Sequence, residues 1–452
     1  MTVFMDVREA IRTAPMRRYQ IRTIAICLVL SMVDGFEILI MAFVAPHLGK
    51  DWGLSSVEIG WLLSAGIIGT ALGAIFISPL ADRIGRRNLA IWCLAGIVIG
   101  MGLSAAAMNV PQMIAFRTFA GVGIGGLVAN LNVLVSEYSS DKRRGSALGI
   151  YAVGYPLGGA LGGVVSGVLI AQFGWRSAFV FGTILTAVLL VIVIRALPES
   201  IEFLIEKRPK DALGKYNTIA KKLGYATSTE LPVRLEVVRN AVRTGLFEGV
   251  MLWRTSALWL GYSCLIAAFY FANTWTPKLL SDSSGDANLG VTAGILISVG
   301  GVVGSLIFAG LAMVMRPRMV TVLLMFGGAI AFGAYANGFQ VAAVALTLSL
   351  CVGIFAAGGV TAFYAISPPI YPTAVRGTGV GWMIGCGRTV SIVAPILTGY
   401  LLNMGMSPKD LYVGFGGVMI VAGVAVVLLD LTYRQKKSRV DAVTSRVESA
   451  SV

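Results

Sequence analysis

The sequence has 452 residues, of which 56% are hydrophobic and only 13% are charged. Charged residues make up about a quarter of an ordinary soluble protein. A soluble fold of this length cannot hide so much apolar surface, which excludes that class. The net charge of +14 does not indicate a nucleic-acid partner, because Lys and Arg fall in short segments between apolar runs, the pattern of membrane topology.

Twelve apolar runs are long enough to cross a bilayer, which takes about 20 residues of helix. The first six predict helices over Ile21–Pro46, Val57–Leu80, Leu89–Met108, Pro111–Ser136, Gly145–Gln172 and Ala178–Leu197. After a polar stretch, the other six predict helices over Ser256–Leu280, Val291–Met315, Met319–Asn337, Val341–Ile370, Gly377–Leu402 and Leu411–Leu431. The sequence therefore predicts an all-α membrane protein.

This pattern divides the chain into two six-helix halves with polar segments around them. We expect an N-terminal segment 1–20, a first half 21–197, a linker 198–253, a second half 254–432 and a tail 433–452. Most of the 36 Lys and Arg residues lie in alternate connecting segments, whereas the opposite segments hold only Lys50, Arg176, Lys278 and Lys409. The positive-inside rule then predicts that both termini are cytoplasmic.

Cysteine and histidine give no sign of a metal site. The five cysteines lie inside apolar runs without paired spacing, and His47 is the only histidine. They are typical of packing residues. We therefore expect no metal and no cofactor other than a coupling proton.

Helix 1 carries two acids, in Asp34-Gly-Phe-Glu37. Residues three apart share a helix face, so both carboxylates can point into one cavity. A buried carboxylate beside an arginine can take up and release a proton. The sequence favours Asp34 and Glu37 as proton-coupling groups, with a static salt bridge to helix 4 as the alternative.

The turn after helix 2 reads Ser78-Pro-Leu-Ala-Asp82-Arg83-Ile-Gly85-Arg86-Arg87. Asp82 can cap a helix N-terminus, while the arginines can pair with carboxylates or helix ends. The alternative is a plain basic turn of the positive-inside kind.

Helix 4 contains Arg117, which is followed by Gly121, Gly123, Gly125 and Gly126. The Gly-x-Gly-x-x-Gly string does not indicate a dinucleotide site, because no strand precedes it. The glycines instead allow a neighbouring helix to approach Arg117 closely. A charge inside the bilayer costs several kcal/mol unless it is paired, so Arg117 requires a partner.

Further candidates for substrate contact lie in helices 5, 7 and 11. Helix 5 contains Tyr155 in a glycine-rich stretch, and helix 7 has Asn273 and Trp275 among other aromatic residues. In helix 11, Trp382 precedes Arg388, which lies about 11 residues past the cytoplasmic turn and so near mid-membrane. A guanidinium among small residues suits a bidentate grip on a carboxylate, with a structural ion pair as the alternative.

These motifs together resemble the major facilitator superfamily, and within it the aromatic acid:proton symporter family. Its signature after helix 2 is similar to the turn 78–87, with Ser78 in place of the usual glycine. Its helix 1 motif is similar to 34–37, with Glu37 where Asp is usual. Other similar stretches are Ser136-Glu-Tyr138, Phe173-Gly-Trp-Arg176, Leu197-Pro-Glu-Ser200, Asn273-Thr-Trp-Thr-Pro-Lys278 and Tyr371-Pro-Thr-Ala-Val-Arg376-Gly-Thr-Gly-Val-Gly-Trp382.

The resemblance implies import of a small aromatic carboxylate by proton symport, with substrate bound between the halves. It implies recognition by Asp34, Glu37, Arg117 and Arg388, and gating of the cytoplasmic side by Asp82, Arg83, Arg86 and Arg87. We expect a monomer in the bacterial inner membrane that binds no nucleic acid and is not an enzyme. The alternatives are an efflux antiporter, a porter for sugars or organic cations, and a receptor without transport.

Overall fold

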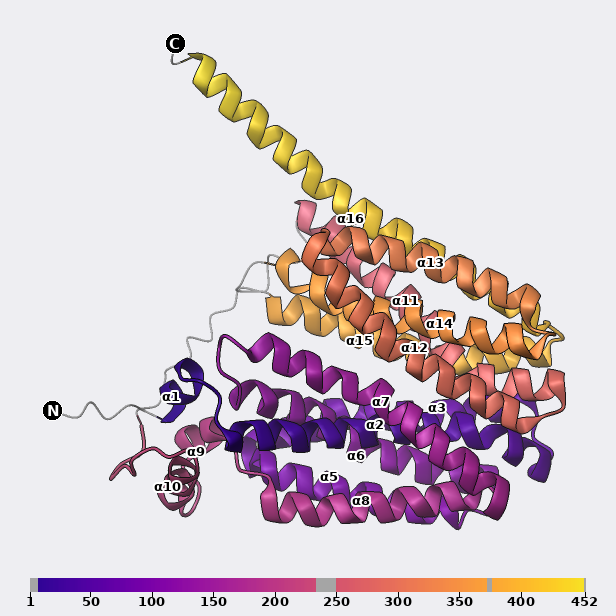
Figure 1. Cartoon of the computed structure of the whole chain (residues 1–452), viewed down its shortest axis with the longest axis horizontal. Coiled ribbons are helices and arrows are strands. Elements are labelled where there is room, and N and C mark those ends of the chain that lie inside the picture. Colours follow the sequence, from indigo (N-terminus) through magenta and orange to yellow (C-terminus); the bar gives the residue numbers. More distant parts are fainter. Residues whose placement is uncertain (1–6, 233–248, 372–375, 451–452) are drawn as a thin grey trace. The chain divides into compact units, whose positions relative to one another are not determined.

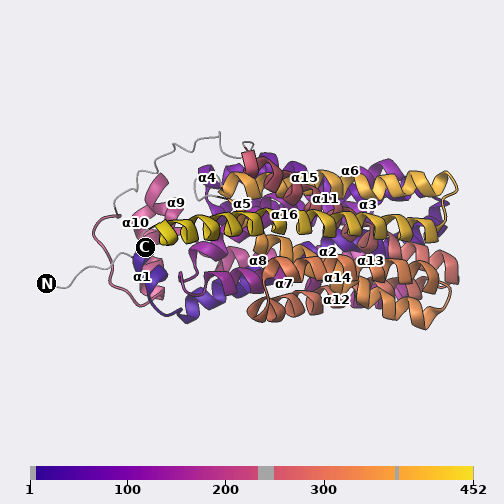
Figure 2. The ribbon, with the colours of Figure 1, turned by 90° about the horizontal axis from the view of Figure 1, so that it is seen from above.

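The computed structural model describes residues 7–232, 249–371 and 376–450, with side chains described up to residue 371 and again from 378 to 433 within those ranges. All regular elements in these ranges are helical (Figures 1 and 2). Their contacts divide the chain into two compact units, Met1–Val238 with Gly290–Ile295, and Arg239–Leu289 with Leu296–Val452.

Twelve helices in the described chain are long and apolar enough to cross a membrane, which confirms the predicted all-α membrane fold. The first six are α2 (Arg18–Trp52), α3 (Ser56–Leu72, continued to Ile84), α5 (Arg86–Ala105), α6 (Val110–Glu137), α7 (Arg144–Phe173) and α8 (Arg176–Ala196). The others are α11 (Gly249–Ser284), α12 (Ala287–Val314), α13 (Pro317–Gly338), α14 (Ala342–Ile366), α15 (Arg376–Asn403) and α16 (Pro408–Ala450).

The two halves repeat one packing scheme. In the first half α2 packs on α7, α3 on α6, and α5 on both α6 and α8. In the second half α11 packs on α15, and α13 packs on both α14 and α16. Glycines of α12 meet the backbone of α14, as those of α3 meet α6. Each pair occupies the same position in the order of its six helices, as expected for a repeat.

The second membrane helix changes geometry before the turn at 78–87. After Leu72 it continues as a π-helical segment, Gly73–Ile77, a 3₁₀ segment, Ser78–Leu80, and the short α4, Ala81–Ile84. Gly85 then adopts φ +97°, a conformation that side chains with a Cβ rarely adopt. This glycine ends α4 and allows α5 to start at Arg86 in a new direction.

Three short helices pack together beside the first half. They are α1 (Val7–Thr13), α9 (Ile201–Lys207) and α10 (Ala212–Lys222), which lie side by side in both views (Figures 1 and 2). Val7 donates its backbone N–H to the Tyr216 hydroxyl at 3.1 Å. The stretch that we expected to be a polar linker therefore contains two helices with a buried apolar face. Residues 233–248 of that linker lie outside the described chain.

Glycines set the spacing between the membrane helices. Gly154, Gly158 and Gly162 of α7 lie one turn apart and meet Ser31, Met32 and Phe36 of α2. Without a hydrophobic driving force between helices in lipid, close backbone packing at small residues is what holds them together. This seam lies directly beside the acids of helix 1.

Candidate functional site

Arg117 and Glu37 form an ion pair inside the first half. Arg117 Nη1 lies 3.0 Å from Glu37 Oε2, and the two side chains are 1% and 0% exposed. Arg117 Nη2 also donates to the backbone carbonyl of Glu37. Glu37 Oε1 and Arg117 Nε make no hydrogen bond within the described chain. The pair is therefore tight but keeps one acceptor and one donor unused.

The helix 4 glycines bring the neighbouring helices against α6, as predicted. Gly121 and Gly125 meet the backbone of the second membrane helix, Gly123 meets α5, and Gly126 meets side chains of both. A Cβ on Gly66 of α3 would lie 3.4 Å from Arg117 Nη2. The guanidinium also lies over the Phe179 ring, with 5.7 Å between Cζ and the centroid. Small residues thus leave just enough room for a buried guanidinium.

Asp34 lies one turn before Glu37 on α2 and is 8% exposed. Tyr151 on α7 is also buried, and its hydroxyl donates to the Val128 carbonyl at 3.2 Å. Gly35, between the two acids, meets the backbone of Tyr155. Only a glycine permits that approach of α7, so the carboxylates and Tyr155 share one crossing point.

Arg388 lies on α15 in the second half and is partly buried. Gly387, the residue before it, meets the ring of Tyr262 on α11, and the Tyr262 hydroxyl lies 3.2 Å from the hydroxyl of Tyr364. The ring of Tyr262 also packs against Phe363, with centroids 5.7 Å apart. The arginine therefore belongs to a group of aromatic residues, two of which carry hydroxyls.

The other aromatic and amide candidates of the second half lie in different surroundings. Trp275 is 1% exposed, and its Nε1 donates to the Pro395 carbonyl at 3.0 Å. Asn273 is also buried and donates to the Phe269 carbonyl of its own helix at 2.9 Å. Trp382 is exposed and stacks on Trp259, with centroids 6.1 Å apart. Trp275 thus joins α11 to α15, while Trp382 is accessible beside Trp259.

The turn at 78–87 forms a cluster of ion pairs. Arg86 Nε lies 2.9 Å from Glu137 Oε1, and Arg86 Nη2 lies 3.6 Å from Asp82 Oδ1. Asn130 donates to the Arg86 carbonyl at 2.7 Å. Asp82 lies in the first turn of α4 and pairs with Arg86 rather than capping a helix N-terminus. Arg83 is exposed.

Glu199 is the residue that meets the start of α5. Its Oε1 accepts the Arg87 backbone N–H at 3.0 Å, and Arg87 Nη2 donates to the Ile194 carbonyl at 2.6 Å. Tyr138 donates its hydroxyl to the Glu199 carbonyl at 2.7 Å. Burial raises the pKa of Tyr138 well above its ordinary value, so this hydroxyl stays a donor at physiological pH.

Glu137 and Glu199 were not among the candidates that we assigned a role from sequence. Their only signal was that each lies in a short stretch resembling the family, Ser136–Tyr138 and Leu197–Ser200. Nothing in the spacing of the chain connects them with Arg86 or Arg87, which lie in a different turn. The fold brings the three segments together.

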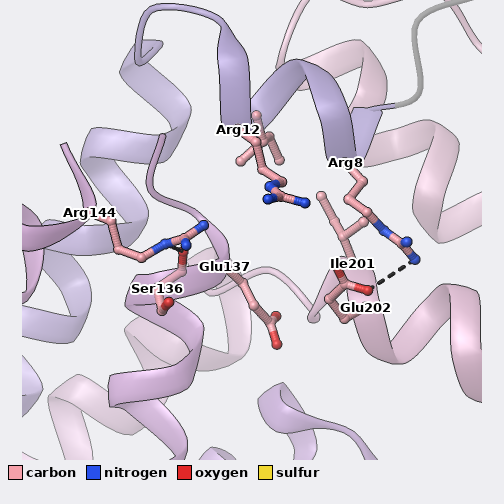
Figure 3. Close-up of a pocket in the computed structure, with 8 residues that line it drawn as sticks. Arg8, Arg12, Ser136, Glu137, Arg144, Ile201 and Glu202 are labelled. Carbon is pink, nitrogen blue, oxygen red and sulfur yellow. Dashed lines mark hydrogen bonds and ion pairs between the residues drawn. The ribbon is translucent and has the colours of Figure 1, made fainter. Parts of the chain in front are cut away.

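A cavity of about 220 Å³ lies next to this cluster, under α1 (Figure 3). Arg12 and Arg144 both pair with Asp141, at 3.3 and 2.6 Å, and Arg8 pairs with Glu202 at 3.0 Å. The lining of the cavity also includes Glu137. These pairs fasten α1 to α9 and to the segment between α6 and α7. Within the described residues, no three His, Cys, Asp or Glu side chains form a group that could hold a metal ion.

Twelve membrane helices in the described part of the chain, arranged in repeated halves with a buried ion pair between two of them, are typical of a polytopic membrane transporter. The family model of the Major Facilitator Superfamily matches residues 25–351. The chain belongs to this superfamily.

Its relatives agree with the resemblance to aromatic acid symporters. The gallate transporter of Pseudomonas putida is 30% identical over 428 residues, which cover 93% of this chain and 94% of that protein. The 4-hydroxybenzoate transporter PcaK of Pseudomonas putida is 31% identical over 410 residues, which cover 89% and 90%. Such relatives are transporters and not enzymes.

The similarity of this chain to a solved structure supports its fold and carries no argument about its function. The inward-open xylose transporter XylE from E. coli matches with a TM-score of 0.69 at 16% identity, covering 90% of this chain and 95% of that chain.

Proposed function

We propose that this protein imports small aromatic carboxylates together with protons across the bacterial inner membrane, by alternating access. The observation that carries the proton coupling is the ion pair between Arg117 and Glu37, held inside an apolar half at 3.0 Å. A charged pair is costly to keep in such a place. A proton-coupled cycle accounts for this buried ion pair, because one partner can be neutralised by a proton and released.

The substrate class is supported by the names of the relatives. They include transporters of gallate, 4-hydroxybenzoate, benzoate, 3-(3-hydroxyphenyl)propionate, niacin and gentisate. All of these compounds are small acids with one aromatic ring. An arginine and ring-stacking residues suit their shared chemistry.

Arg388 is our proposed ligand for the substrate carboxylate. Its group contains Tyr262, Phe363 and Tyr364, which supply ring faces and hydroxyls beside this arginine. The remaining proposed contacts are Arg117, Tyr155, Asn273, Trp275 and Trp382. The buried hydrogen bond of Trp275 to Pro395 gives that side chain mainly a positioning role in this scheme.

The proposed cycle starts with a proton on Asp34 or Glu37. Protonation of Glu37 weakens its ion pair with Arg117, whereas the hydrogen bond of Arg117 to the Glu37 backbone carbonyl keeps α2 beside α6. The bound anion and the proton together carry no net charge, so the cost of enclosing them in an apolar interior is low. After both leave, Arg117 pairs again with the ionised Glu37 and favours the return of the empty carrier. Asp82, Arg83, Arg86 and Arg87 are the proposed gate on the cytoplasmic side.

The test is uptake of radiolabelled 4-hydroxybenzoate, benzoate and gallate by proteoliposomes at external pH 6 and pH 8, with and without a protonophore. Symport predicts faster uptake at pH 6 and loss of accumulation with the protonophore. Uptake that depends neither on the external pH nor on the protonophore would reject proton coupling. Accumulation driven only by an outward proton flow would indicate efflux by antiport, and xylose or an organic cation serves as a substrate control.

A further inference from the structure

Two arginines from different helices lie against the ring of Tyr433 in the second half. The Cζ atom of Arg254, on α11, is 3.7 Å from the ring centroid, and that of Arg318, on α13, is 3.6 Å from it. Arg254 also donates to the side-chain and backbone oxygens of Thr432, at 3.0 and 3.1 Å. The ring and these bonds fix both guanidinium groups in place.

The surroundings of this ring are positively charged. Arg318 pairs with Asp430 at 3.4 Å, and Arg316, two residues earlier, is exposed. Arg318 is thus the arginine that pairs with this carboxylate. We call Arg254, Arg316, Arg318, Asp430 and Tyr433 together the Tyr433 cluster, which has three guanidinium groups and one carboxylate. The positive-inside pattern assigns this end of the half to the cytoplasmic leaflet.

Large apolar side chains next to these arginines in the sequence point away from the protein. Trp253 is 73% exposed, Met313 83% and Val314 81%. They extend the apolar surface of their membrane helices up to the arginines. Tryptophan is enriched at the level of the lipid headgroups. Exposed apolar residues next to arginines are typical of the depth at which acyl chains end and phosphates begin.

We propose that the Tyr433 cluster binds the phosphate of an anionic phospholipid from the cytoplasmic leaflet. Guanidinium groups bind phosphate oxygens through two parallel hydrogen bonds, and lipid fills the space beside Trp253 and Val314. The sequence adds Arg434, Lys436, Lys437 and Arg439 directly after the ring. Basic clusters next to a membrane helix favour anionic lipids. Because the ring holds arginines of α11 and α13 against α16, the lipid stabilises the ends of three helices.

The test measures lipid binding to the purified protein by native mass spectrometry, with phosphatidylglycerol and phosphatidylcholine of identical acyl chains. The wild type is expected to bind phosphatidylglycerol more tightly than phosphatidylcholine. Arg316→Gln with Arg318→Gln is expected to weaken the phosphatidylglycerol affinity by about fivefold for each arginine removed. If the double variant does not fold, Arg316→Gln alone is measured in its place, because it changes an exposed side chain.

The matched control is Lys142→Gln with Arg143→Gln, which removes the same charge from an exposed turn of the first half. It is expected to keep the affinity of the wild type for phosphatidylglycerol. Equal affinities of the wild type and the cluster variant would overturn the proposal. So would an equal loss in the control, which would indicate a general effect of charge. Inorganic phosphate that raises the melting temperature as much as the lipid does would also overturn it, because the site would then bind free anions.

Discussion

Arg117 holds both the side chain and the main chain of Glu37. Nη1 of the arginine lies 3.0 Å from the carboxylate, and Nη2 donates to the backbone carbonyl of the same residue. The carboxylate can change its charge while the backbone bond keeps α2 close to α6. This arrangement separates two roles of Arg117, one in coupling and one in holding the helices, and variants can test each role.

Glu37→Gln is expected to abolish accumulation driven by a pH gradient and to keep exchange of substrate across the membrane. The amide oxygen still accepts a hydrogen bond from Arg117, but it cannot take up a proton. Uptake into proteoliposomes under a pH gradient measures the first property, and counterflow at equal pH measures the second. Glu206→Gln, at an exposed position of α9, is the control. Accumulation by the Glu37 variant at the wild-type level would contradict the coupling role.

Arg117→Leu is expected to destabilise the protein by about 3–5 kcal/mol, because it leaves the Glu37 carboxylate buried without a partner. The double variant Arg117→Leu with Glu37→Leu removes both charges and is expected to recover most of that loss. Unfolding of the purified proteins in detergent measures the difference. A double variant as unstable as the single one would mean that the pair does not act as a unit.

Arg388→Lys keeps the positive charge but replaces a planar group by a point charge. We expect about tenfold weaker binding of an aromatic carboxylate, because a bidentate grip is lost. The concentration of benzoate or 4-hydroxybenzoate that raises the melting temperature of the purified protein measures this change. Arg143→Lys, in an exposed turn, should leave the affinity unchanged. An unchanged affinity of the Arg388 variant would remove this residue from the site.

Much of this architecture follows from the sequence, because each membrane helix needs an apolar run of known length. The sequence also requires a partner for Arg117, since an unpaired charge in the membrane is too costly. It leaves the choice between Asp34 and Glu37 open, because that choice depends on the rotation of α2 against α6. Only the structure shows that Glu37 makes the pair.

The short helices could not be predicted in the same way. With 7 and 11 residues, α9 and α10 are too short to be stable alone, and their apolar residues are buried by packing with α1 and each other. For this reason the sequence predicts only a polar linker for this segment. Glu199 was missed as the partner of α5 for a related reason, since its contact with Arg87 joins residues 112 positions apart.

Gly85→Ala tests how tightly the proposed cytoplasmic gate, the turn 78–87, is packed. Gly85 has φ +97°, and an added Cβ would come against the Glu199 carboxylate and the Phe203 ring. We expect a loss of about 1–3 kcal/mol from backbone strain, with a further loss from that contact. Gly174→Ala is the control, because Gly174 has φ +79° and open space around it. The difference in melting temperature between the two variants reports the contact with Glu199. Equal losses would show that this contact adds nothing.

Gly158→Ala tests the seam between α7 and α2. A Cβ at Gly158 would meet the backbone of Met32, whereas Gly149, on the same helix, has nothing within 4 Å. Backbone cannot move aside as a side chain can, so Gly158→Ala must push α7 away from the crossing at Gly35 and Tyr155. We expect a lower melting temperature and slower uptake for Gly158→Ala. Gly149→Ala should be neutral or stabilising by up to about 1 kcal/mol, because alanine favours a helix. If both variants behave alike, the close approach of α2 and α7 is not what positions Asp34 and Glu37.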